Sequence, residues 1–526
     1  MKSILRLFGT ACLAACCTHA AHAADDVIAA AWNDALAACL VPSTHDGHAV
    51  LTITPSVPGG ANFVFEFVGG PTDGFYSTQT PASGSACQPG ETLGDCRQRA
   101  LAFVAAYWGS LLQSSVPIVA DVSMPVVIDC ASRPPYYGAA GPNYERWDFP
   151  NAPHPGTAYT GALANALAGQ DLAPSSSEMQ VMLNEGADHG CEGSWAGWWY
   201  GTDADAPMPE DRLPFVTVML HEFAHALGFQ PGYLGTDGSP HYDGITPAWG
   251  YYLYDTGIGK LWKDMNDGER SMSLHNDPHV VWTGPQANRW IDQYLGRPVD
   301  LVVTAPLASA GTYVTESANA GLPLHADLTR SVVIVDDGVG NGNPLSLSDG
   351  CEVPFANAAE LAGKIALVNL YTCPLGRKMA NARSQGAAAV LIANLSSPGP
   401  TPMYVTGEDS AIPAFGIEQA IGDAMFAAPS GTFNVTLRPQ AASERAGSDD
   451  GCVRMHAPAA TQPGSALAHF SADARPGLLM MPSQPVGLRR VGLALRVLED
   501  SGWHVRAEDG LFVDGFDPSA CLHVQP

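Results

Sequence analysis

The sequence predicts a mixed α/β protein with more than one domain, and three observations support this. The chain has 526 residues, more than a single hydrophobic core ordinarily serves. Hydrophobic residues make up 46% of it and charged residues only 15%, a composition typical of folded globular proteins. Strand-like apolar runs alternate with helical patterns along most of the chain, and no internal repeat is found.

The first 23 residues have the three parts of an export signal. The basic start MKSILR precedes the apolar run LFGTACLAACC, and THAAHA ends in a small-residue cleavage pattern after Ala23. This predicts a secreted, extracellular protein. The alternative is the lipobox-like LAAC, which would leave Cys16 lipidated and the protein anchored in the cell envelope. No other segment is long and apolar enough to span a bilayer.

Charge and cysteine content restrict the partners and the compartment. A formal net charge of -27 argues against a nucleic acid or an anionic membrane as a partner. Nine cysteines remain after the signal segment, scattered and without a C-x-x-C pair, which favours disulfides over a cysteine zinc site. Cys87/Cys96 and Cys351/Cys373 are the predicted bridges, and the odd count leaves one thiol unexplained. The oligomeric state is not indicated.

The elements can be predicted in chain order. Before the central motif, NFVFEFV, VPIVADVSM and MPVVIDC predict strands, and CRQRALAFVAAYWGSLL predicts a helix. Residues 229–297 are aromatic and loop-rich, and residues 298–440 alternate β-rich and helical patterns. Near the C-terminus LRRVGLALRVLEDSG predicts a helix that ends at Gly502.

The stretch LPFVTVMLHEFAHALG predicts a helix over 213–228. Pro214 suits its first turn and Gly228 the position after its end. Its apolar residues recur with a spacing of three or four and form one stripe. His221 and His225 lie one turn apart, off that stripe, so both imidazoles can bind a single zinc ion with Glu222 beside them.

The third zinc ligand is missing from this stretch. Catalytic zinc takes three protein ligands and an open position for water. In the compact signature a third histidine follows the glycine by three residues, but that position is Pro231, which cannot bind a metal. Local candidates follow in the next loops: His241, Asp243 and Glu269. Glu269 would give a His-His-Glu zinc site.

A distant segment offers another source. HEFAHALGF, the later GSALAHF and the LMMP that follows resemble the leishmanolysin-type metzincin proteases. The resemblance implies an α+β metzincin-like catalytic domain with His469 as the third zinc ligand. It also implies Met480 as the methionine of the turn beneath the metal, with Met481 as a neighbouring alternative. Phe470 replaces the usual tryptophan, and the residues between His469 and Met480 match loosely.

The chain between these two segments has its own pattern. LAGKIALVNLYTCPLGRKMANARSQGAAAVLIANL predicts a strand–helix–strand unit, followed by AIPAFGI. This pattern resembles the protease-associated (PA) domain, a non-catalytic module that the resemblance links to substrate access or protein contact; a generic α/β insertion is the alternative. The predicted division is a signal peptide 1–23, a first catalytic part 24–297, an inserted PA domain 298–440, a second catalytic part 441–505 and a tail 506–526.

These features predict a secreted zinc metalloendopeptidase that hydrolyses peptide bonds of extracellular proteins. One Zn²⁺ would be held by His221, His225 and His469, with Glu222 as the general base and Met480 as structural support. The Asp/Asn/Gly loop DDGVGNGNP is a candidate for Ca²⁺, but the candidate is unsupported because the loop lacks EF-hand spacing. Alternatives are an exported protein-binding module with a structural or vestigial zinc site, a His-His-Glu enzyme, or an aminopeptidase, since PA domains also accompany those enzymes.

Overall fold

The computed structural model describes residues 39–506 with internal gaps. The gaps are 46–47, 56, 71, 126–136, 190–195, 204–207, 210, 235–236, 339–346, 395, 397, 401–402, 406–410, 461–463, 484–486 and 489. The predicted signal segment with Cys16 and nearly all of the tail lie outside the described residues, as do most of MPVVIDC and of the loop DDGVGNGNP. Within the described part, no helix combines the length and the apolar character needed to cross a bilayer.

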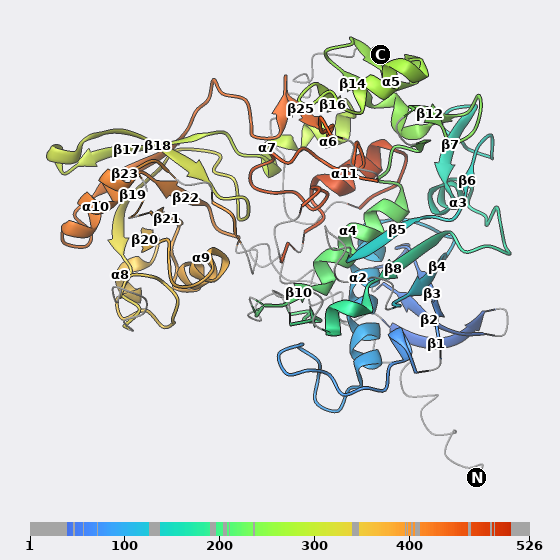
Figure 1. Cartoon of the computed structure of the whole chain (residues 1–526), viewed down its shortest axis with the longest axis horizontal. Helices are drawn as coiled ribbons and strands as arrows, with labels where there is room; N and C mark the ends of the chain where they lie inside the picture. Colours follow the sequence, from blue (N-terminus) through green and yellow to red (C-terminus); the bar gives the residue numbers. More distant parts are fainter. Residues whose placement is uncertain are drawn as a thin grey trace.

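A mixed sheet forms the base of the larger domain (Figure 1). Its order is β1 (Cys39–His45), β2 (His48–Thr54), β3 (Phe63–Val68), β4 (Ile118–Ser123), β8 (Met179–Leu183) and β5 (Gly138–Pro142). β3, β4 and β8 run parallel, whereas β5 pairs antiparallel with β8 and lies at the edge of the sheet. The strands predicted from NFVFEFV and VPIVADVSM are confirmed as β3 and β4.

Two helices pack near this sheet. They are α2 (Leu93–Leu111) and α4 (Phe215–Leu227). The ring of Phe223 on α4 lies 5.6 Å from the ring of Phe63 and 6.1 Å from that of Phe65, between centroids. Trp108 on α2 donates its indole N–H to the carbonyl of Leu220 at 3.3 Å. These buried contacts fix the position of α4 against β3 and α2.

Short elements follow the sheet strands and complete this part of the domain. They are η1 (Gly74–Tyr76), β6 (Glu145–Arg146), β7 (Thr157–Thr160), α3 (Gly161–Ala168), η2 (Glu185–His189), β9 (Trp198–Trp199), β10 (Leu213–Pro214), β11 (Tyr233–Leu234), β12 (Ser239–Pro240), β13 (Thr246–Pro247), η3 (Ala248–Tyr251), β14 (Leu253–Asp255), β15 (Lys260–Leu261), η4 (Trp262–Asp264), α5 (Asp267–Ser273), β16 (Val280–Trp282), α6 (Pro285–Arg289) and α7 (Ile291–Tyr294). The loop-rich character predicted for 229–297 is reflected in how short these elements are.

The next stretch of chain forms a closed barrel beside the larger domain (Figure 1). The strands in barrel order are β17 (Val299–Ala305), β18 (Gly311–Ser317), β22 (Ala414–Ile417), β21 (Ala389–Ala393), β20 (Ile365–Asn369), β19 (Leu328–Ile334) and β23 (Asn434–Pro439), with helices α8 (Ala358–Leu361), α9 (Leu375–Ser384) and α10 (Gln419–Ala427). β20 and β21 are parallel and α9 connects them, so the predicted strand–helix–strand unit is confirmed. Val299 pairs with Pro439, which places the two ends of the barrel segment side by side.

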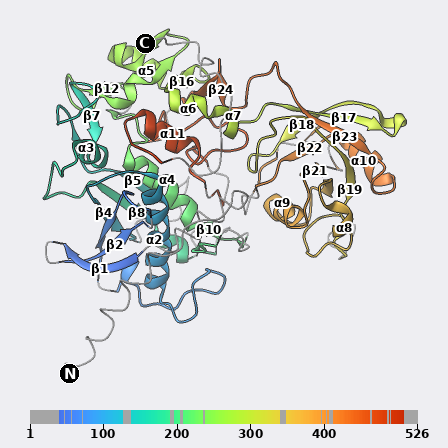
Figure 2. The same cartoon turned by 180° about the vertical axis from the view of Figure 1, so that it is seen from behind.

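After the barrel the chain returns to the larger domain (Figure 2). The elements here are β24 (Ser448–Asp449), β25 (Cys452–Arg454) and α11 (Leu493–Asp500). β25 pairs with β16, and residues that precede the barrel in sequence share one hydrophobic core with residues that follow it. The helix predicted near the C-terminus is confirmed as α11, which starts only after Gly492 and is followed by Gly502 at a φ of 122°.

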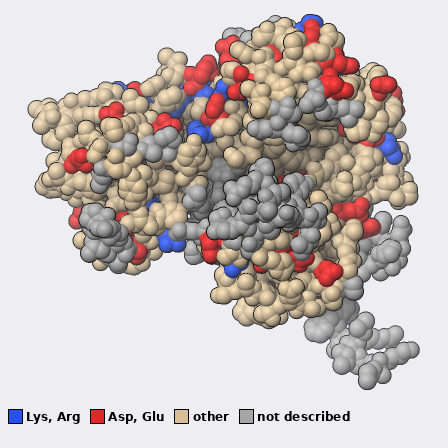
Figure 3. All heavy atoms as spheres, in the orientation of Figure 1, with Lys and Arg blue, Asp and Glu red and all other residues tan. Residues whose placement is uncertain are grey.

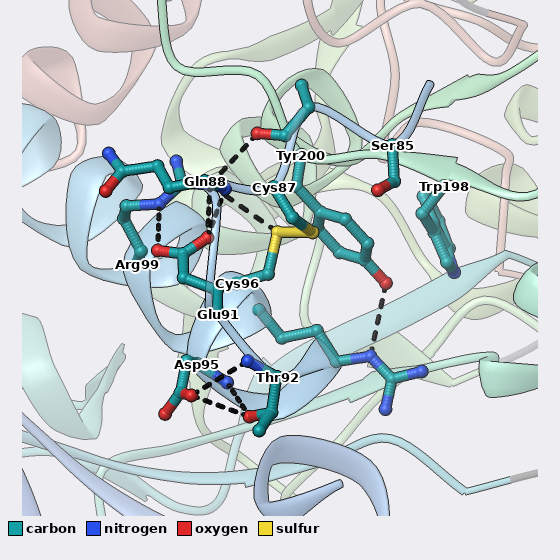
Figure 4. The surroundings of a disulfide bond; sticks show 12 residues. Ser85, Cys87, Gln88, Glu91, Thr92, Asp95, Cys96, Arg99, Trp198 and Tyr200 are labelled. Atoms are coloured by element: carbon teal, nitrogen blue, oxygen red, sulfur yellow. Dashed lines mark hydrogen bonds and ion pairs between the residues drawn. A yellow bond between two sulfur atoms is a disulfide. The ribbon is translucent and has the colours of Figure 1, made fainter. Parts of the chain in front are cut away.

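Both predicted disulfides are formed. They are Cys87–Cys96 and Cys351–Cys373, and Cys452 is also disulfide-bonded. Figure 4 shows the first bridge joining the loop before α2 to the first turn of that helix, where Thr92 and Asp95 form a capping box. On the face shown in Figure 3, acidic side chains are spread over both domains, in keeping with the net charge of -27.

Candidate metal centre

Helix α4 presents the two histidines of the sequence motif. The helix begins after Pro214 and ends at Gly228, whose φ of 123° favours glycine and breaks the helical path, so the predicted bounds are confirmed to within two residues. The Nε2 atoms of His221 and His225 lie 3.0 Å apart. The helical spacing of four residues therefore brings both imidazoles to one point.

His469, which follows the barrel in the sequence, reaches the same point. Its Nε2 lies 3.2 Å from the Nε2 of His221, and one ligand atom from each of the three histidines lies within 4.8 Å of the others. The carbonyl of His469 accepts a hydrogen bond from His456 N at 2.8 Å, and Met455 forms an antiparallel β-bridge with Phe470. The segment is thus held by the chain that follows β25, and β25 itself pairs with β16.

The hydrogen bonds of the three rings determine their tautomers. Each Nδ1 lies 2.8 Å from a backbone carbonyl oxygen, which belongs to Leu479 for His221, to Phe229 for His225 and to Ser465 for His469. Because a carbonyl can only accept, each Nδ1 carries the hydrogen and each Nε2 presents a lone pair. The Nε2 atoms of His225 and His469 lie only 3.0 and 3.2 Å from the Nε2 of His221. At these distances their lone pairs repel one another unless a cation lies between them.

These separations match a zinc ion. Three nitrogens at about 2.0–2.1 Å from a tetrahedral zinc are about 3.3 Å from each other. Burial lowers the pKa of His225 to about 4 and that of His469 to about 3, and the neighbouring rings of His225 and His456 add to the effect at His469. Burial first, and then the two neighbouring rings, hold the pKa of His221 well below its usual value. All three rings are therefore neutral near pH 7, as metal ligands must be.

Glu222 lies between α4 and the edge strand β5. Its side chain is buried, with 9% of its surface exposed. Burial raises its pKa to about 8, although a hydrogen bond from the backbone N–H of Ala140 partly opposes the rise. A Cβ at Gly138 would lie only 3.2 Å from the Cγ of Glu222, so the missing side chain at that position gives the carboxylate its room. A divalent cation at the histidines would lower this pKa again by attraction.

The turn that contains Met480 is fixed to two of the three histidine segments. The carbonyl of Leu479 accepts from the ring of His221, and the carbonyl of Met480 accepts from Phe470 N at 2.7 Å. Met480 is fully buried. The sulfur of Met481 accepts a hydrogen bond from Leu478 N at 3.2 Å, so that side chain folds back on its own turn.

The local alternatives for the third ligand are placed elsewhere. Glu269 forms the capping box of α5 with Asn266 and an ion pair with Lys260 at 2.6 Å. Neither Glu269 nor His241 nor Asp243 belongs to the group formed by His221, His225 and His469. In this structure Glu269 is therefore engaged at the start of α5 and not at the histidine group.

A second group of ligand-type side chains lies in the barrel. Asp337, Asp349 and Glu352 offer oxygens within 4.8 Å of one another. The buried ammonium of Lys378 donates to the carbonyl of Asp349 at 2.5 Å and interacts electrostatically with all three carboxylates. Because Lys378 supplies a positive charge at this place, we infer no calcium site from the group.

Several parts of the site have no signal in the sequence. The carbonyls that orient the imidazoles belong to Leu479, Phe229 and Ser465, and a backbone oxygen is the same at every residue. Strand β5 has the sequence GAAGP, which lacks the β-branched and aromatic residues typical of strands. Its position beside Glu222 is therefore visible only in the fold.

A recess at the end of α4 contains a further buried acid. Glu145, Gly228 and Trp249 are among the residues that line it. Burial raises the pKa of Glu145 from 4.5 to about 7, with a hydrogen bond from Gln230 opposing the rise. The folded state thus holds this proton more tightly than the unfolded chain. The resulting stability is present below the unfolded pKa and is lost as pH rises through the folded one.

Glu145→Gln tests this linkage. The variant is expected to be more stable than wild type at pH 8 by about 2 kcal/mol, because an ionised buried carboxylate is replaced by a neutral amide. At pH 4 to 5 the two proteins should unfold at nearly the same temperature. Thermal unfolding followed by circular dichroism at both pH values measures the difference. An equal shift at the two pH values would mean that charge is not the cause.

Comparison with known proteins identifies one part of the chain. A family model for the PA domain matches residues 340–425, which lie within the barrel segment. No curated protein matches the chain. The PA domain predicted from the sequence is thus confirmed.

Solved structures show only a distant likeness. A zinc aminopeptidase from Bacillus subtilis is 20% identical with a TM-score of 0.21, covering 30% of this chain and 35% of its own. An aminopeptidase from Aneurinibacillus sp. strain AM-1 is 25% identical with a TM-score of 0.21, covering 29% and 32%. A subtilisin-like protease from Pseudoalteromonas sp. AS-11 is 19% identical with a TM-score of 0.20, covering 28% and 33%. The chain spans about a third of the length of these structures. What the comparisons establish is that the chain contains a PA domain.

Proposed function

We propose that the protein is a secreted zinc metalloendopeptidase of the metzincin type. The observation that carries this proposal is the convergence of three neutral imidazoles, His221, His225 and His469, on one point beside the carboxylate of Glu222. In this proposal the three histidines hold the zinc ion. When bound, zinc supplies a Lewis acid that lowers the pKa of water towards about 7 and polarises a carbonyl group.

The chain's own residues perform the proton transfers in this proposal. The Glu222 carboxylate accepts a proton from the attacking water and then donates it to the leaving amine nitrogen. Met480 takes no part in the chemistry. Its turn keeps the carbonyl of Leu479 against His221.

Strand β5 is suited to align a peptide substrate. It is an edge strand that pairs with β8 on one side, and Ala140 in its middle contacts Glu222. An extended peptide can add to such an edge through main-chain hydrogen bonds, largely independent of its sequence. A peptide bound in this way would run beside the carboxylate, as hydrolysis within a chain requires.

The structure of the cluster favours catalysis over a structural zinc site. Structural sites are usually closed by four protein ligands, whereas catalytic sites keep one position for water. In the described part of the chain the group consists of three histidines. A merely structural site would also have no use for a buried base such as Glu222 beside the ligands. Export is supported by the predicted signal segment and by the disulfides of the described residues.

Hydrolysis of casein by the purified protein tests the proposal. We expect activity that a zinc chelator abolishes and added Zn²⁺ restores. A peptide blocked at both ends should also be cut, because an endopeptidase needs no free terminus. Cleavage restricted to peptides with a free amino terminus would instead assign an aminopeptidase. A zinc-loaded protein that cuts neither substrate would support the protein-binding alternative.

A further inference from the structure

A short segment of the PA domain contacts the chain around Met480, beside the metal centre. This segment, residues 318–322, follows β18 and is called the brace below. The carbonyl of Asn319 accepts a hydrogen bond from Gly477 N at 2.7 Å. The guanidinium of Arg490 donates to the carbonyl of Gly321. Two parts of the chain on either side of Met480 are therefore bonded to the brace.

The brace is fixed within the PA domain on its other side. Asn319 donates its backbone N–H to the carbonyl of Met403 at 3.0 Å, and its side-chain Oδ1 accepts from Val405 N at 2.6 Å. Gly321 has a φ of 106°, and a Cβ there would lie 2.4 Å from the carbonyl oxygen of Ile412. The brace can therefore neither take a side chain at Gly321 nor turn freely at Asn319.

The loop that the brace holds is the one that orients His221. Gly477 precedes Leu479 by two residues, and the Leu479 carbonyl accepts from the Nδ1 of His221 at 2.8 Å. Hydrogen bonds of this kind fix the tautomer and the direction of a metal-binding imidazole, and their loss weakens metal binding. A shift of Gly477 would move that carbonyl and, with it, the ring.

We propose that Asn319 is a positioning residue for the metal centre. It joins PA-domain residues 403–405 to the turn that contains Met480, so that the PA domain contributes to the geometry of the zinc ligands. This inference rests on the proposed zinc-dependent function. It assigns the inserted domain a role in organising the site, in addition to any contact with substrate.

Three variants of the full-length protein test the proposal. Asn319→Ala removes the acceptor for Val405 N, whereas Asn319→Asp keeps an oxygen there. Asn357→Ala is the matched control, because Asn357 also ties PA-domain backbone through its side chain, accepting from Asp336 N at 3.0 Å and donating to the Ile334 carbonyl at 2.8 Å. The measurements are zinc affinity by chelator competition, the visible spectrum of the cobalt-substituted protein, kcat and KM, and hydrogen exchange of peptides that cover 471–483.

We expect Asn319→Ala to bind zinc about tenfold more weakly, to change the cobalt spectrum and to lower kcat more than it raises KM. Hydrogen exchange at 471–483 should become faster. Asn319→Asp should restore most of each property, and Asn357→Ala should leave the zinc affinity and the cobalt spectrum at their wild-type values.

Two results would overturn the proposal. One is a wild-type cobalt spectrum together with unchanged exchange in Asn319→Ala. The other is an equal loss of zinc affinity in Asn357→Ala, which would indicate general destabilisation of the PA domain. Failure of the proposed function is recognised separately, as a wild-type protein that binds no zinc. In that case the exchange at 471–483 alone decides whether Asn319 holds the turn.

Discussion

The Glu222→Gln variant is expected to bind zinc like the wild-type protein and to hydrolyse peptides about 10²–10⁴ times more slowly. Glutamine has the size of glutamate, so the fold should persist, and its amide oxygen can still accept the hydrogen bond from the Ala140 N–H. An amide cannot take a proton from water at neutral pH. The loss should therefore appear in kcat/KM for a blocked peptide while the metal content stays at one zinc per chain.

A buried glutamate that does not belong to the histidine group provides the control. Glu178 is 1% exposed and accepts hydrogen bonds from Val119 N at 2.7 Å and from the Tyr144 hydroxyl at 3.0 Å. Glu178→Gln makes the same chemical change in a buried position, so it reports any general effect of removing an internal carboxylate. Activity near the wild-type level in Glu222→Gln would show that another group acts as the base.

The second large effect is expected at His469. Removal of one of three ligands should weaken zinc binding by more than the roughly 10–100-fold that loss of a partner around the ligands typically costs. His469→Ala is therefore expected to lose its zinc during dialysis against a mild chelator, with hydrolysis falling in parallel. The metal content after dialysis, measured by atomic emission, provides the comparison with wild type.

Two matched variants make this result specific. His275→Ala removes a half-buried histidine whose Nδ1 also lies 2.9 Å from a carbonyl, that of Pro458, but which does not belong to the cluster. Glu269→Ala removes the acid that a His-His-Glu site would use. Both should retain zinc. Retention in His469→Ala combined with loss in Glu269→Ala would assign the protein to the His-His-Glu class instead.

The insertion of a whole barrel between two zinc ligands has a simple structural basis. Val299 and Pro439 are paired in neighbouring strands, so the chain enters and leaves the barrel at one place. β16 and β25, the strands on either side of the insertion, then pair directly with each other. The segments before and after the barrel therefore form one hydrophobic core, as they would if a long loop joined them. This packing allows His469 to lie beside α4.

The sequence alone determined the features that depend on neighbouring residues. The bounds of α4 follow from Pro214, Gly228 and an apolar stripe with helical spacing, and the disulfides Cys87–Cys96 and Cys351–Cys373 join cysteines that are close in sequence. Helix periodicity, caps and short loop closures are local effects, so a single sequence expresses them directly.

Tertiary structure decided the contacts between distant parts of the chain. The approach of His469 to His221, the carbonyl of Leu479 behind that ring, the edge strand at Ala140 and the contact of Asn319 with Gly477 all arise from packing between separate segments. Apart from the pairing of the two histidines, which the family resemblance suggested, these contacts use backbone atoms, which every residue carries, so no residue pattern encodes them. The sequence specified which imidazoles and which carboxylate were available, and the packing of β16 against β25 and of the turn at Met480 decided where they meet.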